Sequence, residues 1–151
     1  MIKIINYKEE LKDHIRILNY EWLQKYFTVE PNDVVSLADP QKEIIEKGGC
    51  IFYASYNEEI VGVVALLKIE DDTYELAKMA VAEKYQGLKV GKILMEHCIE
   101  FSKINGIKKL VLYSNRSLGP AIHIYEKYGF YEIPLEPGHY ERANIKMEKR
   151  V

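Results

Sequence analysis

The chain has 151 residues, of which 48% are hydrophobic, so it is long enough and apolar enough to form one domain with a buried core. Its formal net charge is −2 and its lysines and arginines are scattered, which excludes the basic stripe that a nucleic-acid partner requires. The longest apolar run, residues 60–67, is far shorter than the roughly 20 residues that cross a bilayer, so no membrane partner is expected. Cys50 and Cys98 have neither a C-x-x-C partner nor a histidine at ligand spacing, which favours reduced thiols, no metal and a cytoplasmic location.

Local patterns in the N-terminal half predict a strand, two helices and a hairpin. Residues 2–5 form a short extended run, and apolar residues then recur at helical spacing: Leu11, Ile15, Leu18, Trp22 and Tyr26. A second short helix is expected at residues 39–49, with Asp39 as its N-cap and two glycines at its end. Two extended runs on either side of residues 57–59 predict a hairpin.

The C-terminal half alternates predicted strands and helices. Residues 74–81 predict a strand with an irregularity such as a bulge, because Leu76, Met79 and Val81 do not keep strict alternation. The pattern then predicts a helix from Val90 to the Asn105-Gly106 stop, a strand at 108–114, a helix at 119–129, and strands at 130–135 and 143–148. No repeat or Pro/Gly-rich linker divides the chain, so residues 1–151 are predicted to be a single mixed α/β domain.

The stretch YQGLKVGKILMEHC (residues 85–98) places Gly87 and Gly91 directly before an amphipathic run. A Walker phosphate loop is excluded by the glycine spacing and by Ile93 after the G-K pair, and a dinucleotide fingerprint lacks its third glycine. What remains is a strand, a short loop and a helix start, whose unpaired N–H groups and dipole attract an anion. Three lysines flank the same point: Lys84, Lys89 and Lys92. A helix start that binds nothing explains these local features equally well.

Two signatures, found together and in this order, resemble the GNAT superfamily of acyl-CoA-dependent N-acyltransferases over about residues 50–147. Gln86 and Gly91 match the first and last positions of its pyrophosphate motif, [RQ]-x-x-G-x-[GA], while Lys89 stands where the middle glycine is usual. The second stretch, PAIHIYEKYGF, is similar to that superfamily's A-x-x-x-Y-x-x-x-G-F segment, with matches at Ala121, Tyr125, Gly129 and Phe130.

The resemblance implies a fold and a cosubstrate. The expected fold is a GNAT-like, mostly antiparallel twisted sheet of about six to seven strands, flanked by about four helices. The strand near residues 74–81 would splay from that near 109–114 and admit the pantetheine arm of acetyl-CoA. The implied cofactor-binding residues are Met79, Ala80, Val81, Gln86, Gly87, Leu88, Lys89, Val90, Gly91, Lys92, Asn115 and Tyr125. Leu118 stands where the superfamily's usual asparagine occurs, which puts one common cofactor contact in doubt. Lys89 is expected in helical conformation, so Lys89→Gly is expected to weaken acetyl-CoA binding.

The resemblance also implies catalytic groups. Tyr125 matches a tyrosine that acts as general acid toward the departing thiolate, and a packing role in a stripe with Ile122 and Tyr128 is the alternative. Glu75 occupies the position of a glutamate general base in some members, and a solvent-facing strand glutamate is the alternative. Direct attack in a ternary complex is expected, because neither cysteine lies in a nucleophile–base arrangement. His97, on the apolar face of its helix, is interpreted as a hydrogen-bonded core or edge residue.

By the same resemblance, acceptor specificity would come from the N-terminal helices and from the loop before the last strand. The candidate substrate-binding residues are Tyr26, Phe27, Glu30, His139 and Tyr140. Tyr26, Phe27, Glu30 and Asp33 form an aromatic and acidic set that would suit a cationic amine, and His139 and Tyr140 could reach a substrate from the loop before the last strand. A simpler interpretation places Tyr26 on the core stripe, and Glu30 and Asp33 in a solvated loop around Pro31.

The sequence therefore favours an N-acetyltransferase that acetylates a primary amine of a small molecule, amino acid or peptide. The alternative is a non-catalytic acyl-CoA-binding or sensing domain on the same fold. Exposed strand edges and 12 tyrosines are compatible with a homodimer.

Overall fold

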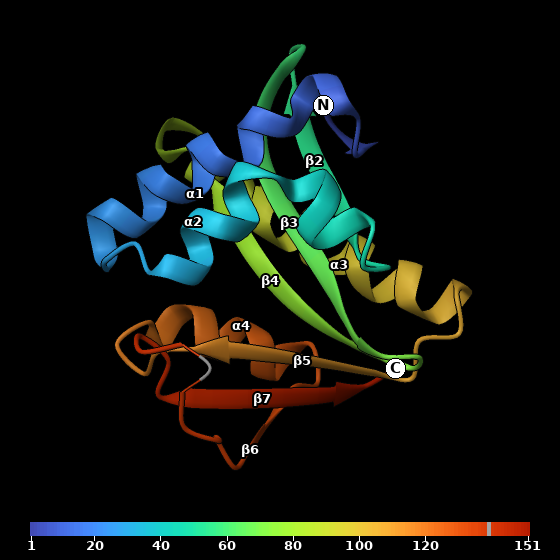
Figure 1. Cartoon of the computed structure of the whole chain (residues 1–151), viewed down its shortest axis with the longest axis vertical. Helices are drawn as coiled ribbons and strands as arrows, with labels where there is room; N and C mark the ends of the chain where they lie inside the picture. Colours follow the sequence, from blue (N-terminus) through green and yellow to red (C-terminus); the bar gives the residue numbers. More distant parts are fainter. Residues whose placement is uncertain (139) are drawn as a thin grey trace.

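Seven strands form one twisted sheet in the order β1-β2-β3-β4-β5-β7-β6 (Figure 1). The computed structural model describes residues 1–138 and 140–151. The strands are β1 (Ile2–Asn6), β2 (Cys50–Tyr56), β3 (Glu59–Glu70), β4 (Thr73–Val81), β5 (Lys109–Ser114), β6 (Tyr131–Ile133) and β7 (Ile145–Arg150). The helices are α1 (Lys12–Tyr26), α2 (Pro31–Ala38), α3 (Val90–Ile104) and α4 (Gly119–Lys127), with shorter turns η1 (Glu9–Leu11), η2 (Gln41–Ile45) and η3 (Glu83–Leu88). The expected mixed α/β fold is confirmed.

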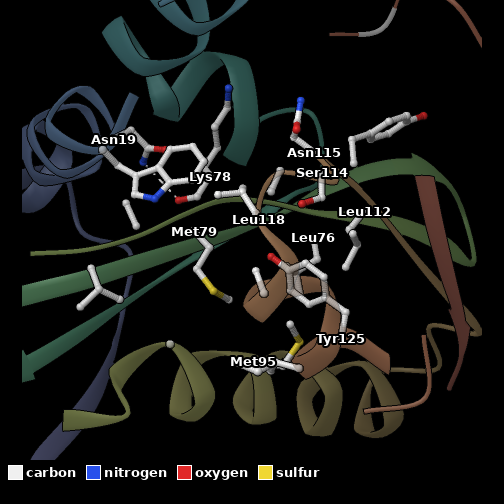
Figure 2. Close-up of a pocket in the computed structure, with 18 of the residues that line it drawn as sticks. Asn19, Leu76, Lys78, Met79, Met95, Leu112, Ser114, Asn115, Leu118 and Tyr125 are labelled. Atoms are coloured by element: carbon white, nitrogen blue, oxygen red, sulfur yellow. Dashed lines mark hydrogen bonds between the residues drawn. The ribbon is translucent and has the colours of Figure 1, made fainter. Parts of the chain in front are cut away.

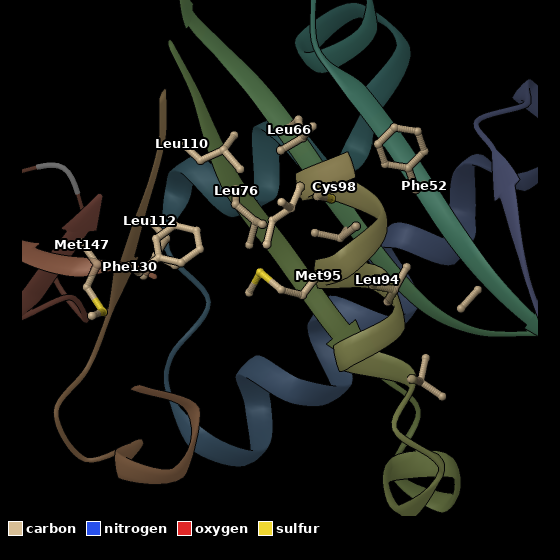
Figure 3. Close-up of a cluster of buried hydrophobic side chains, with 14 of the residues drawn as sticks. Phe52, Leu66, Leu76, Leu94, Met95, Cys98, Leu110, Leu112, Phe130 and Met147 are labelled. Atoms are coloured by element: carbon tan, nitrogen blue, oxygen red, sulfur yellow. The ribbon is translucent and has the colours of Figure 1, made fainter. Parts of the chain in front are cut away.

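The strands alternate their side chains between two buried layers. On one face, Phe52 and Leu66 pack against α3, whose Leu94, Met95 and Cys98 point at the sheet (Figure 3). On the other face, neighbouring residues of the same strands pack against α1, α2 and η2. The central strand β3 is therefore apolar on both faces over much of its length, as the run of apolar residues there predicts. None of the helices in the described part of the chain is both apolar enough and long enough to span a bilayer.

One close contact sets the position of α3. A Cβ added at Gly62 of β3 would lie 2.8 Å from Cγ1 of Val90, the first residue of the helix. Glycine at this position thus lets the start of α3 approach the sheet closely. The free N–H groups of that helix start consequently lie beside the end of β4.

The predicted strand irregularity is a β-bulge in β4. Val63 pairs with Ala80 and Ala65 pairs with Ala77, so two residues of β4, Lys78 and Met79, face a single residue of β3. Lys78 adopts φ 57°, which is a left-handed conformation that a non-glycine residue rarely takes. The bulge interrupts the hydrogen-bond ladder to β3 at this point.

Among the strands that the structure describes, β4 and β5 are the only parallel neighbours, and they pair over a short stretch. Their register runs from Thr73 opposite Lys109 to Glu75 opposite Val111. Beyond that point β4 continues to Val81 and β5 continues to Ser114, but the described residues of the two strands no longer pair with each other. Figure 1 shows the two strands diverging. The expected splay between these strands is confirmed.

The segment around Pro31 differs from the predicted solvated loop. Helix α2 begins at Pro31, and Glu30 is its N-cap in a capping box with Asp33. The side chain of Asp33 is fully buried. The short helix expected at residues 39–49 is a single turn of π-helix, η2, although the backbone N–H of Lys42 does donate to Oδ1 of Asp39 at 3.2 Å.

Candidate functional site

The splay between β4 and β5 opens into a cavity of about 650 Å³ (Figure 2). Its walls come from α1, β4, β5, α4, the start of α3 and the loop before β7. Most residues that the sequence analysis singled out line it: Phe27, Glu75, Met79, Ala80, Val81, Gln86, Gly87, Lys89, Gly91, Lys92, Asn115, Tyr125 and Tyr140. Tertiary structure thus brings together residues from distant parts of the chain.

At one end of the cavity, the two glycines leave the start of α3 open. A Cβ added at Gly91 would meet only Sδ of Met79, at 3.9 Å, and one at Gly87 would meet no heavy atom within 4 Å. Helix α3 has 15 residues, and its first N–H groups have no partner within the helix. Lys89 and Lys92 line the cavity beside them. Free donors, a helix dipole and two ammonium groups make this end suitable for a phosphate.

Lys89 is left-handed, with φ 60° and ψ 26°, so the prediction of a helical conformation is wrong. The residue joins η3, which ends at Leu88, to α3, which begins at Val90. With no loop between two consecutive helical segments, one residue must turn the chain, and the left-handed conformation does so. The conformation of Lys89 therefore no longer supports the expectation that Lys89→Gly weakens acetyl-CoA binding. The positive charge of Lys89 beside the cavity still supports it, and the expectation stays a prediction.

We expect Lys89→Gly to be more stable than Lys89→Ala by about 1 kcal/mol, because only the alanine keeps a Cβ at positive φ. Both variants lack the ammonium group, so the comparison isolates the backbone conformation. Thermal unfolding should place the midpoint of the glycine variant roughly 2–4 °C higher. Equal midpoints would show that the left-handed conformation costs this loop nothing.

Two buried contacts hold the bulge in β4. The amide of Asn19, on α1, donates to the carbonyl of Lys78 at 3.1 Å and to that of Ile15 at 2.9 Å. The ammonium of Lys78 lies 3.0 Å from Oδ1 of Asp33, and both side chains are almost completely buried. The unusual backbone of Lys78 is thus fixed from α1 and from α2 at once, beside the cavity.

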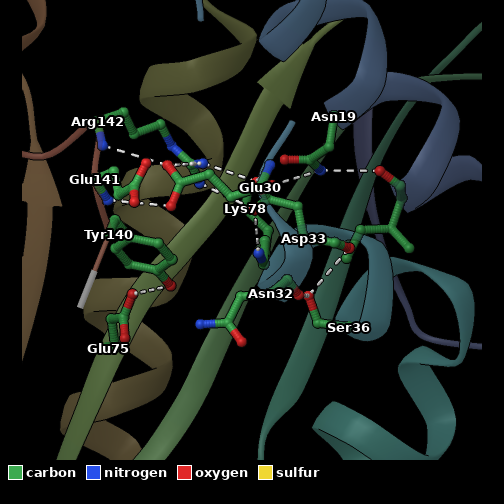
Figure 4. Close-up of polar contacts among 11 residues, drawn as sticks. Asn19, Glu30, Asn32, Asp33, Ser36, Glu75, Lys78, Tyr140, Glu141 and Arg142 are labelled. Carbon is green, nitrogen blue, oxygen red and sulfur yellow. Dashed lines mark hydrogen bonds and ion pairs between the residues drawn. The ribbon is translucent and has the colours of Figure 1, made fainter. Parts of the chain in front are cut away.

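Asp33 is the centre of an ion-pair network that joins three segments (Figure 4). Arg142, in the loop before β7, donates to both carboxylate oxygens of Asp33, at 2.8 and 3.0 Å, and to Glu30 at 2.9 Å. Burial alone would raise the pKa of Asp33, but the hydrogen bonds from Arg142 and the charge of Lys78 outweigh it and lower that pKa. The network ties α2 and β4 to the loop that closes the cavity.

Tyr125 lies on α4 and lines the middle of the cavity (Figure 2). Its ring packs edge-on against Phe130, with centroids 6.2 Å apart, and its hydroxyl has no hydrogen-bond partner among the described residues. Burial raises the pKa of Tyr125 above its ordinary value of 10.0, so the phenol keeps its proton at neutral pH. A protonated hydroxyl that faces a cavity can donate a proton to a group bound there.

Glu75 is not the solvent-facing strand residue of the alternative interpretation. It is 3% exposed, it lines the cavity, and the hydroxyl of Tyr140 donates to its Oε2 at 3.0 Å (Figure 4). Burial first, and then the charge of Glu75, raise the pKa of Tyr140. The phenol of Tyr140 therefore keeps its proton at neutral pH, and it lies beside the Glu75 side chain at the same wall of the cavity.

Several predicted residues do not line the cavity. Tyr26 is 45% exposed, so it is not the buried core residue of the simpler interpretation, and Leu88 is equally exposed. Val90 is buried in the core, and Glu30 is engaged with Arg142. His139 lies outside the described residues.

Two other side chains contact other parts of the protein rather than standing free. Asn115 lines the cavity, but its amide donates to the carbonyl of Arg142 at 2.7 Å and accepts from the backbone of Ser117. His97 packs edge-on against Phe52, and burial lowers its pKa. Its Nε2 is buried without a hydrogen-bond partner among the described residues, so the expected hydrogen bond is not observed at that atom.

Five further cavity residues that matter for the site are not predicted from the sequence. Trp22 was interpreted only as core, and the other four carried no local signal: Asn19, Lys78, Tyr113 and Arg142. Their significance depends on contacts between segments far apart in the chain, such as the 109 residues between Asp33 and Arg142. By contrast, the capping box at Glu30 was a local signal that could have revealed α2.

Comparison with known proteins adds to this geometry. Residues 16–130 match the model of the acetyltransferase (GNAT) family. An uncharacterized N-acetyltransferase of Bacillus subtilis, YvbK, is 34% identical over 102 residues, which cover 65% of this chain and 65% of that protein. The chain thus spans less than two thirds of the length of the curated relatives it matches.

Solved structures share the whole fold. An acetyltransferase of the GNAT family from Staphylococcus aureus Mu50 superposes with a TM-score of 0.87 and 23% identity, over 99% of each chain. A GNAT family acetyltransferase from Elizabethkingia anophelis, solved with acetyl-CoA bound, gives a TM-score of 0.65 and 27% identity over 99% of this chain and 98% of that one.

Proposed function

Because the chain belongs to the acetyltransferase (GNAT) family, we propose that it transfers an acetyl group from acetyl-CoA to a primary amine of a small molecule, amino acid or peptide. The observation that carries this proposal is the cavity between the splayed strands. It extends from the glycine-lined start of α3 to the protonated phenol of Tyr125 and the buried carboxylate of Glu75.

The residues at the α3 end fit the pyrophosphate of CoA. Gly87 and Gly91 leave room for phosphate oxygens to approach the backbone, and Lys89 and Lys92 add positive charge. The part of β4 that includes the bulge residue Met79 and runs to Val81 would provide backbone N–H groups for the pantetheine arm and for the thioester oxygen, at Met79 and Val81. Leu88 and Val90, which flank Lys89 at the junction of η3 and α3, do not line the cavity and would support this junction from outside it.

Acetyl-CoA supplies an acyl group on a thioester, which an amine can attack directly in a ternary complex. The amine must arrive, or become, neutral, and Glu75 with Tyr140 would orient it and receive its proton directly or through water. Tyr125 would hold a proton at its hydroxyl for the departing thiolate. The bulge backbone would stabilise negative charge on the thioester oxygen.

A screen of amine acceptors tests the proposal. We expect calorimetry to show acetyl-CoA binding, and a thiol reagent to detect CoA released with at least one primary amine, amino acid or peptide. A control without acceptor corrects for background, which includes any reaction of the partly buried Cys50. Binding without release for any acceptor would favour the sensing domain over the enzyme. The absence of binding would contradict both.

Other expectations from the sequence stay predictions. Solution scattering or ultracentrifugation would test the homodimer, and fractionation would test the cytoplasmic location. The expected absence of a metal requirement would be tested by assaying activity with and without a chelator.

A further inference from the structure

Resting on the proposed function, we propose that Asn19 of α1 is a positioning residue of the transferase. Its side-chain amide holds the peptide group between Lys78 and Met79 in one orientation, and it thereby aims the backbone N–H of Met79 at the thioester oxygen of acetyl-CoA. Asn19 acts through that peptide group rather than on the reacting atoms. The inference comes from the hydrogen bonds of one buried amide and from the geometry of one peptide group.

Both hydrogens of the Asn19 amide are in use. Asn19 is 4% exposed, and its Nδ2 donates to the carbonyl oxygen of Ile15 at 2.9 Å and to that of Lys78 at 3.1 Å (Figure 4). Both partners are acceptors, so the NH2 group of the amide must be the part that faces them. The first bond stays within α1 and the second crosses to β4. An amide that is buried and bonded twice is fixed in its orientation.

The carbonyl of Lys78 and the N–H of Met79 belong to the same peptide group. That group is planar and trans, so its C=O and its N–H point in opposite directions. A carbonyl that faces Asn19 therefore turns the N–H of Met79 away from α1. Half a turn of this peptide plane would need changes only in ψ of Lys78 and φ of Met79, but it would reverse both groups and break the bond to Asn19.

The side away from α1 is the side on which the proposed general acid lies. Ile15 and Leu18 of α1 belong to the core cluster on one face of the sheet, whereas Met79 and Tyr125 pack against the cluster on the other face. Figure 2 shows Asn19 and Tyr125 on opposite sides of Met79. The N–H of Met79 thus points toward the part of the cavity where the thioester is proposed to lie. A donor held there in advance stabilises negative charge without reorganisation.

The salt bridge of Lys78 constrains the bulge less directly. The ammonium lies 3.0 Å from Oδ1 of Asp33, but a flexible aliphatic stem separates that ammonium from the backbone. With φ 57°, Lys78 has a conformation that costs free energy and persists only where the surroundings enforce it. The amide of Asn19 enforces it at the peptide group itself.

Helix α1 is fastened to the chain on both sides of Met79. Beyond the bulge, Oε1 of Glu21 accepts the backbone N–H of Glu83 at 3.0 Å, and the ammonium of Lys25 lies 2.7 Å from Oε1 of Glu83. Three side chains of one helix thus contact the segment 78–83 near both of its ends. The helix is a fixed support from which Asn19 sets the peptide plane.

Infrared spectroscopy of bound acetyl-CoA tests this inference without any turnover. An isotope label on the acetyl carbonyl identifies its stretching band, and a hydrogen bond to the oxygen lowers the frequency of that band. We expect the band in the wild-type complex to lie below that of free acetyl-CoA, and to return toward the free value in Asn19→Leu, because leucine is branched like asparagine but has no donor.

Ser102→Ala is the matched control. Ser102 is also buried on a helix, and its hydroxyl donates to the carbonyl of Cys98 at 2.7 Å, but it lies outside the cavity lining. The complex of this variant should keep the wild-type band. A loss of the shift in Ser102→Ala as well would show that any lost buried hydrogen bond has the same effect, and it would overturn the proposal.

Asn19→Ser separates the hydrogen bond from packing. A serine hydroxyl can bond to the carbonyl of Ile15 within the helix, but its shorter side chain leaves Lys78 out of reach. Leucine and serine thus change the volume in opposite directions, and both lose the bond to Lys78. Well below the unfolding midpoint of each variant, both should lower kcat at least about tenfold, since loss of an oxyanion-hole donor itself costs about 10²–10³. The Kd for CoA, which has no acetyl group, should stay within about twofold. An effect confined to one variant would assign the role to packing and overturn the proposal.

The spectra and the acceptor screen can fail independently. If the band moves as expected in the wild type and in both Asn19 variants, but no acceptor releases CoA, the inference stands and the proposed catalysis fails. If CoA is released but the band of the wild-type complex equals that of free acetyl-CoA, the inference fails and the proposed function stands. The inference also fails if Asn19→Leu and Asn19→Ser both keep the wild-type band.

Discussion

Tyr125→Phe is expected to lower kcat about 100-fold, while the Kd for acetyl-CoA stays unchanged. The substitution removes only the hydroxyl, and positioned general acids contribute about 10²–10⁴-fold to catalysis. The ring would still pack against Phe130 and fill the same volume of the cavity. Single-turnover kinetics would measure the chemical step, and calorimetry would measure the affinity.

Tyr128→Phe is the matched control, since Tyr128 lies at the end of the same helix and its hydroxyl bonds to the exposed Glu96 at 3.0 Å. This control should retain wild-type kcat. If Tyr125→Phe also stays within about twofold of wild type, the leaving thiolate obtains its proton elsewhere, and Tyr125 has the packing role.

The raised pKa of Tyr125 also predicts how kcat depends on pH. Because burial raises its pKa above the ordinary 10.0, the acid form persists throughout the neutral and mildly alkaline range. The midpoint of any loss of kcat through deprotonation of this group should therefore lie above pH 10, and this loss should be absent in Tyr125→Phe. A decline centred near pH 8 in the wild-type enzyme would have to come from another group.

Asp33→Ala is expected to lower the free energy of unfolding by about 3–5 kcal/mol at pH 7. The substitution leaves Arg142 and Lys78 with buried positive charge that their remaining partners compensate only in part. Urea unfolding measures the loss. Asp71→Asn is the control, because Asp71 is fully exposed in its pair with Lys68, and no measurable change is expected there.

The contribution of Asp33 to the free energy of unfolding should decrease at acid pH. Its pKa is lower in the folded protein than the ordinary 3.8, so the unfolded chain binds the proton more tightly. The stabilisation is therefore fully present above about pH 4, and it is lost as the pH falls through the folded pKa. The difference in stability between wild type and Asp33→Ala should shrink in that acid range. A difference that is constant down to pH 2 would show that the charge of Asp33 is not its source.

Local sequence was enough to predict most of the elements. The stripe in residues 90–104 and its Asn105-Gly106 stop predict α3, because helix periodicity and capping act over a few residues. The broken alternation near Met79 predicts the bulge for the same reason. The two GNAT-like signatures identified the family, and with it the approximate position of the cavity.

Backbone conformation at a single residue was less predictable. Lys89 was expected to be helical, but its left-handed conformation follows from how η3 and α3 meet, which depends on the packing of both against the sheet. Propensity alone disfavours a left-handed lysine, and the tertiary arrangement overrides it.

The set of polar and aromatic side chains around Asp33 and Tyr140 was decided by tertiary structure alone. Asp33 bonds to Lys78 and Arg142, which are 45 and 109 residues away, and a local pattern does not record which distant cations will face a buried carboxylate. The same folding that satisfies these charges turns Trp22, Phe27, Tyr113 and Tyr140 toward one cavity. The sequence by itself thus determined the family and the glycine-lined start of α3, whose motif is contiguous. Long-range contacts determined which polar and aromatic side chains line the rest of the cavity, because these residues come from segments that meet only in the folded chain.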